Sequence, residues 1–325
     1  MIIGGLLIVS WIRGVFLFGL ETSTNELRSY LYFFATLFYT ITLKFSQELL
    51  HKIIVMFGLI SCIVILVAIV RWILIGLNII SSTSWIAPNG WTTRVISAGA
   101  TFVLLQMLII IFYKKNSLIA FLSLLIVLPI IIGVQHRTIW VALVVSIILL
   151  IIITSKIKSV SFLGFLLIFV FILYIFIVNN FSLESFSGTS LDLSTFSWRF
   201  FGWEAVFSPE RFQSYFDYFI GQPLGTGYLR YIPEYGYETA INPHNFYIQT
   251  FLNIGGFGLM TLITLYSSLL IKLWKFKQES TSIAIFLIFI AQLVFFVTYT
   301  PGFEQGFILG LGILFATQGM KNQKS

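Results

Sequence analysis

The sequence predicts an all-α protein: a polytopic bundle of about ten transmembrane helices, with one large periplasmic loop that forms a small helical cap. Two observations predict this fold class. Of the 325 residues, 58% are hydrophobic and only 10% are charged, a composition far from that of an ordinary soluble domain. The apolar residues also form runs of about 17–25 residues, which is the length of helix needed to cross a bilayer.

The apolar runs follow one another along the whole chain. The first lacks a positively charged start and a small-residue cleavage site, so we expect a retained span and not a removed signal peptide. The second is short, and the third is long enough to tilt in the bilayer. The expected spans are 2–20, 29–43, 53–80, 95–113, 117–134, 138–154, 159–178, 244–271, 282–299 and 303–318.

The lysines predict the orientation of the chain. They fall in alternate connections, from Lys44 and Lys52 to Lys321 and Lys324. By the positive-inside rule these connections and both termini are cytoplasmic. The chain then divides into N-terminal transmembrane helices at 1–178, a large periplasmic loop at 179–243 and C-terminal transmembrane helices at 244–325. The loop is too rich in aromatic residues for a disordered linker, which predicts a folded cap.

Composition also excludes several classes of function. The net charge is +7, but the basic residues form no patch with exposed aromatics, so we expect no nucleic-acid partner. The single cysteine, Cys62, and the three histidines, His51, His136 and His244, are too few for a disulfide framework or a multi-histidine metal site. We therefore expect no metal and no cofactor.

The arginines are distributed differently from the lysines. Arg13 and Arg71 lie within spans, and the others are expected on the outer side, where Arg137 opens a span and Arg199 lies in the large loop. A planar guanidinium binds phosphate in a bidentate way that lysine cannot reproduce. Ten acidic residues share that side, so ion pairing is the alternative role for these arginines.

The strongest motif begins at Asn242. Asn242 is a good helix N-cap and Pro243 suits the first helical position, so we expect a helix from here to about Leu270. His244 then lies on one face with Gly255 and Gly258, where small residues allow another helix to pack closely. The partial positive charge at the helix N-terminus disfavours imidazolium, so a neutral His244 can accept a proton. The alternative is that His244 is an interfacial anchor.

Three of these residues could form one site at the outer surface. Arg137 and Arg199 would bind a diphosphate leaving group, and His244 would deprotonate an acceptor hydroxyl. Neither role requires a metal ion.

The motif resembles that of a known family. His244-Asn245, nine further residues and then Gly255-x-x-Gly258 are similar to the signature of the O-antigen ligase family, which includes related polysaccharide polymerases. The resemblance covers about residues 120–318. It implies a glycosyltransferase of the bacterial inner membrane that moves a glycan from undecaprenyl diphosphate to an acceptor hydroxyl at the periplasmic side. Its partners would be the lipid-linked glycan, the lipid bilayer and an acceptor glycan or lipid A-core.

The family pattern leaves some points open. Members commonly have about twelve spans, so this chain resembles a compact or N-terminally shortened member, and the match at Glu304 in the last outer loop is poor. The residues do not separate a ligase from a polymerase. A transporter or flippase of lipid-linked oligosaccharide is the alternative function, although nearly charge-free spans favour the enzyme.

Overall fold

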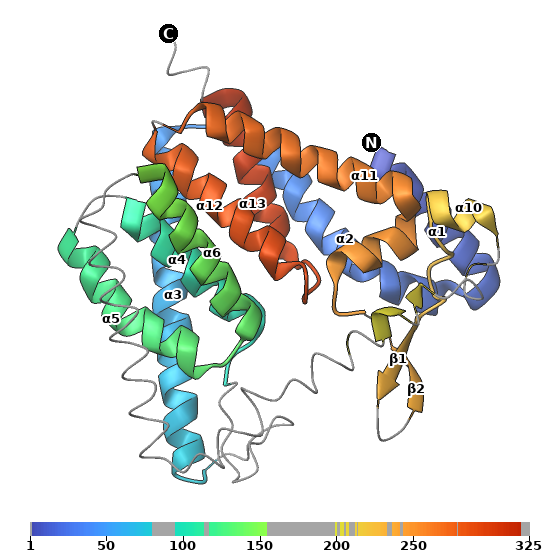
Figure 1. Ribbon diagram of the computed structural model, residues 1–325, viewed down its shortest axis with the longest axis horizontal. Coiled ribbons are helices and arrows are strands. Elements are labelled where there is room, and N and C mark those ends of the chain that lie inside the picture. The colour runs from blue at the N-terminus through green and yellow to red at the C-terminus, as the bar shows by residue number, and fades with distance from the viewer. Residues whose placement is uncertain are drawn as a thin grey trace. The chain divides into compact units, whose positions relative to one another are not determined.

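The computed structural model describes most of the chain in two compact units. The described residues are 2–79, 95–113, 117–154, 199, 202–204, 206–207, 212, 214–232, 236–240, 243–277 and 279–319. The first unit comprises residues 1–45, 193–275 and 295–325, and the second comprises residues 46–192 and 276–294. Figure 1 labels the α-helices and β-strands of both.

The first unit contains α1 (Ile2–Phe18), α2 (Leu20–Ile41), α10 (Tyr215–Ile220), β1 (Tyr228–Ile232), β2 (Gly236–Ala240), α11 (Phe246–Lys275), α13 (Phe303–Leu314) and η2 (Phe315–Gly319). The second contains α3 (Gln47–Gly76), α4 (Ala98–Tyr113), α5 (Ser117–Gly133), α6 (Arg137–Thr154) and α12 (Ser280–Phe295).

The helix α2 is the centre of the first unit. It follows α1 after Gly19, whose φ of 86° is accessible to glycine without strain. Its other neighbour, α13, carries Gly306 and Gly310, one helical turn apart. A Cβ on Gly306 would lie 2.1 Å from the carbonyl oxygen of Phe33. Small residues at this spacing let the two backbones approach closely, as in pairs of membrane helices.

The second unit is built on α3, α4, α5 and α6, which contact one another in sequence order. The turn between α5 and α6 holds Gln135 in the left-handed region, with φ 57°. The next residue, His136, is buried, and its Nε2 lies 3.0 Å from the carbonyl oxygen of Ile96. His136 therefore fixes the turn that precedes α6.

Among the described residues, two helices are long and apolar enough to cross a membrane, α3 and α11. Only 22% of the most apolar window of α3 is buried within the protein, and its exposed side chains include Leu59, Ile63, Leu66 and Ile73. The core helix of a soluble protein would be mostly buried, whereas a helix that is apolar on all sides suits a lipid environment. The exposure of α3 therefore favours contact with lipid.

Every predicted span within the described residues overlaps a helix, with ends that differ by up to nine residues, and the span at 159–178 lies outside them. Several of these helices are shorter than a full crossing, so the number of spans remains a prediction. The large loop differs from the expected helical cap. Its described part includes α10 and an antiparallel hairpin in which Tyr228 pairs with Ala240. The aromatic and β-branched residues of this segment favour strands, which accounts for the difference.

Candidate functional site

The helix that follows His244 begins later than predicted. α11 starts at Phe246, and Asn245 caps it, because its Oδ1 accepts a hydrogen bond of 3.0 Å from the backbone N–H of Ile248. The expected start with Pro243 in the first helical position is therefore wrong, and Asn242 lies outside the described residues. Asparagine suits both positions, and the contacts made by the tertiary structure select Asn245.

His244 therefore precedes the helix instead of lying in its first turn. Its φ is 52°, in the left-handed region that histidine, asparagine and aspartate enter more often than most residues. Its side chain is partly exposed. Strained backbone of this kind is frequent at functional sites, because the surrounding structure must hold it in place.

Contacts on both sides hold the backbone of His244. On one side, the indole Nε1 of Trp203 donates a hydrogen bond of 2.9 Å to the carbonyl oxygen of Pro243. On the other side, the N–H of Phe246 donates one of 2.9 Å to the carbonyl oxygen of Phe296. The ring of Phe246 is fully buried and packs against that of Phe296, with ring centroids 4.7 Å apart. His244 thus lies between two anchored residues.

Trp203 belongs to the loop segment that also contains Arg199. Arg199, Gly202, Trp203 and Glu204 have helical geometry. Trp203 bonds to the residue before His244, so the described part of this loop segment reaches the histidine turn at Trp203. Arg199 is itself only partly exposed.

The close packing expected at the motif glycines is present at Gly255, but its partner is unexpected. Gly255 has φ 68° and ψ −174°, which interrupts α11. A Cβ there would lie 2.2 Å from the carbonyl group of Phe219, the penultimate residue of α10. A short helix of the loop, and not another long helix, fills this space. At Gly258, a Cβ would instead meet the side chain of Ile254.

This interruption also overturns the expected common face of His244, Gly255 and Gly258. His244 lies outside the helix, and the helical geometry is broken before Gly258. The carbonyl oxygen of Leu252, next to the break, accepts a hydrogen bond of 2.6 Å from the N–H of Gln222. The loop segment thus supplies a backbone bond at the point where the helix is interrupted.

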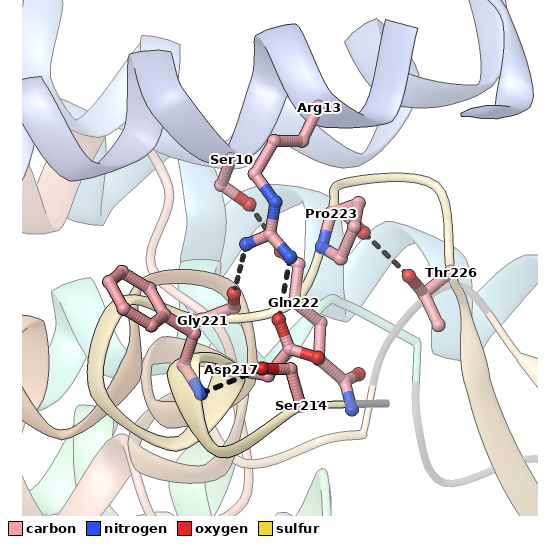
Figure 2. A network of polar contacts seen from close by, with 9 residues as sticks. Ser10, Arg13, Ser214, Asp217, Gly221, Gln222, Pro223 and Thr226 are labelled. Atoms are coloured by element: carbon pink, nitrogen blue, oxygen red, sulfur yellow. Dashed lines mark hydrogen bonds and ion pairs between the residues drawn. The ribbon is translucent and has the colours of Figure 1, made fainter. Parts of the chain in front are cut away.

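A charged contact fixes this loop segment to α1. Figure 2 shows the guanidinium of Arg13 directed toward Asp217 and Gly221. Its distances are 2.6 Å to the Asp217 carboxylate and 2.7 Å to the Gly221 carbonyl oxygen. Nearby, the hydroxyl of Ser10 donates to the carbonyl oxygen of Gln222. The position of Arg13 within an apolar helix, unexplained by the sequence, is thus explained by a buried acidic partner.

We expect Arg13→Leu to lower the free energy of unfolding by about 2–3 kcal/mol, because it leaves the buried Asp217 carboxylate without its cation. Thermal unfolding of the detergent-solubilised protein measures this loss. The double variant Arg13→Leu/Asp217→Asn should recover part of it, since no buried charge remains. Equal stability of the double variant and Arg13→Leu would contradict the role of this ion pair.

The third predicted site residue lies in the other unit. Arg137 is the first residue of α6, after the turn fixed by His136, and it is partly exposed. Arg199 and His244 both belong to the first unit. The structure therefore places Arg199 and His244 in the first unit and Arg137 at a helix start of the second unit.

Sequence reasoning missed a group of buried polar residues beside α11. The carboxylate of Glu26 on α2 accepts a hydrogen bond of 2.5 Å from the N–H of Gly225. The buried hydroxyl of Tyr228 donates one of 2.9 Å to Oδ1 of Asn253. Burial, and then the negative charge of Glu26, raise the pKa of Tyr228 well above its usual value. The signal available in the sequence was the presence of polar residues in otherwise apolar runs.

No cluster of three potential metal ligands among histidine, cysteine, aspartate and glutamate occurs in the described part of the chain. The chemical groups that the first unit offers are the imidazole of His244, the guanidinium of Arg199 and backbone held by the loop. Such groups can bind an anion and accept a proton.

Comparison with known proteins identifies this region. Residues 122–263 match the sequence model of the O-antigen ligase family. The matched segment includes Arg137, Arg199, His244, Gly255 and Gly258. No curated protein and no solved structure gave a match. The resemblance indicated by the His244 motif is therefore confirmed.

Proposed function

We propose, from the premise that residues 122–263 are an O-antigen ligase-type region, that this protein transfers a glycan from undecaprenyl diphosphate to an acceptor hydroxyl. The family indicates glycan ligation in the biosynthesis of surface polysaccharide. The proposal adds the lipid-linked donor, a site at the periplasmic side of the bacterial inner membrane, and cytoplasmic termini. The acceptor is either lipid A-core or a second lipid-linked glycan.

The proposed reaction is a single displacement at the anomeric carbon of the donor sugar. The acceptor oxygen forms a bond to this carbon while the bond from the carbon to the diphosphate oxygen breaks. The leaving diphosphate keeps the electron pair, and the acceptor proton passes to the imidazole of His244. The guanidiniums of Arg199 and Arg137 stabilise the negative charge that grows on the diphosphate.

One observation carries the proposal: the hydrogen bond from Trp203 to the carbonyl oxygen of Pro243. It joins the loop segment that carries Arg199 to the turn that carries His244. This contact joins parts of the chain that are forty residues apart, and it supports the pairing of His244 as proton acceptor with Arg199 as anion-binding group. The left-handed backbone of His244 adds support, because the protein maintains it at a cost of about 1–3 kcal/mol.

A transfer assay with the purified protein tests the proposal. The donor is an undecaprenyl-diphosphate-linked oligosaccharide, supplied with and without lipid A-core, and the products are separated on a gel. A single product that requires lipid A-core indicates a ligase, whereas a ladder from donor alone indicates a polymerase. Movement of the donor across liposome membranes, without either product, would indicate a transporter of lipid-linked oligosaccharide instead of an enzyme.

We expect Arg199→Lys to reduce transfer by about ten-fold or more, because an ammonium cannot reproduce the bidentate contact of a guanidinium with phosphate. Arg137→Lys should have a similar effect. The initial rate at a subsaturating donor concentration measures both. Arg71→Lys, which makes the same exchange on α3, is the matched control. Unchanged transfer by Arg199→Lys and Arg137→Lys would remove their diphosphate-binding role.

A further inference from the structure

The first unit has an open pocket of about 250 Å³ between α2, the start of α11 and the segment before α13. Its lining residues are Asn25, Glu26, Arg28, Ser29, Tyr32, Gln249 and Pro301. The volume corresponds to about eight water molecules, which is the scale of one sugar ring. None of these residues belongs to the diphosphate or proton-transfer roles described above.

The pocket contains an unsatisfied polar group. Gln249 is only 3% exposed, and its Nε2 lies 3.4 Å from the hydroxyl of Ser29. Within the described part of the chain, its Oε1 has no hydrogen-bond partner. A buried acceptor without a donor costs about 1–3 kcal/mol, so its presence in a pocket indicates a ligand that donates a hydrogen bond.

The remaining groups narrow the chemistry of this ligand. Arg28 is exposed, and its guanidinium already contacts Oδ1 of Asn25 at 3.0 Å. One cation and one carboxylate line the pocket, so their charges balance and do not favour an anion. The ring of Tyr32, 56% exposed, offers an apolar face. The pocket therefore suits a neutral ligand that donates hydrogen bonds through hydroxyl groups and stacks on an aromatic ring. A sugar has these properties.

The pocket is also close to the proposed reaction centre. Gln249 lies three residues after the start of α11, about one helical turn from the residues that follow His244. We infer that this pocket binds one sugar residue of the glycan that takes part in transfer, through Gln249, Arg28 and the ring of Tyr32. The inference rests on the proposed function, and the sugar belongs to either the donor or the acceptor.

Binding measurements with three probes test this inference on the purified full chain. The probes are an undecaprenyl-diphosphate-linked repeat unit, sugar-free undecaprenyl diphosphate, and the same repeat unit without lipid. Gln249→Leu removes the unsatisfied acceptor at nearly constant volume. Tyr32→Ala removes an exposed ring, and it is the alternative test variant if the Gln249→Leu protein does not fold. Tyr39→Ala is the matched control, because Tyr39 is exposed on the same helix two turns away and does not line the pocket.

We expect Gln249→Leu and Tyr32→Ala to weaken binding of a sugar-bearing probe by about five- to ten-fold and to leave sugar-free undecaprenyl diphosphate unaffected. Weaker binding of the lipid-linked repeat unit assigns the pocket to the donor, and weaker binding of the lipid-free repeat unit alone assigns it to the acceptor. Unchanged binding of both overturns the inference. If wild-type protein binds neither lipid probe, the proposed function fails, while the lipid-free repeat unit still tests the pocket.

Discussion

His244→Asn should lower the rate of glycan transfer by about 10²–10⁴-fold, the range expected when a general base is removed. Asparagine is the informative substitution because it tolerates the left-handed backbone at this position, whereas alanine would add strain. Asparagine cannot accept the acceptor proton. The measurement is the initial transfer rate at saturating donor and acceptor, with thermal unfolding recorded on the same preparation.

His51→Asn is the control for this experiment, since His51 is an exposed residue in the first turns of α3 and has no proposed role. It should transfer glycan at the wild-type rate. A His244→Asn protein that is folded and retains wild-type transfer would exclude the imidazole as the proton acceptor. Loss of folded protein in His244→Asn would instead indicate a structural role for this turn.

Gly255→Ala should lower the free energy of unfolding by about 4 kcal/mol or more, through backbone strain and overpacking together. The φ of 68° is unfavourable for alanine, and the new Cβ would lie 2.2 Å from the backbone of Phe219. The short helix α10 would have to move away from α11. We also expect glycan transfer to be lost, because α10 belongs to the loop segment that packs against the interrupted helix.

Thermal unfolding and limited proteolysis of the solubilised protein measure this effect. Gly5→Ala is the control, since a Cβ at Gly5 would meet no atom within 4 Å. Gly256→Ala tests the geometry more closely, because its Cβ would lie 3.3 Å from the carbonyl oxygen of Tyr218 and requires only a small shift. If the Gly255→Ala protein were as stable as the Gly5→Ala protein, close packing of α10 against Gly255 would be excluded.

The motif of the candidate site could be predicted because its signals are local. The nine residues between Asn245 and Gly255 and the Gly255-x-x-Gly258 spacing are visible in the sequence, and they identify the same region that the family comparison matches. The face shared by His244 and these glycines could not be predicted correctly. It assumed one uninterrupted helix from Asn242, whereas α11 starts at Phe246 and breaks at Gly255.

The pocket beside α11 shows the same limit. Glu26 and Gln249 are single polar residues in largely apolar stretches, and nothing in their spacing shows that they line one cavity. Their proximity depends on the packing of α2 against the start of α11, where the rings of Phe33 and Phe246 lie 6.0 Å apart. Such a packing arrangement is not encoded in a local pattern.

The sequence by itself predicted a helical protein, the approximate positions of its helices and the motif that resembles the O-antigen ligase family. These features follow from apolar runs and short spacings, which act within one helix. The tertiary structure decided where α11 begins, why Gly255 is a glycine and what holds Arg13. The reason is distance along the chain: Arg13 and Asp217 are separated by 204 residues, and only the folded chain brings their charges together.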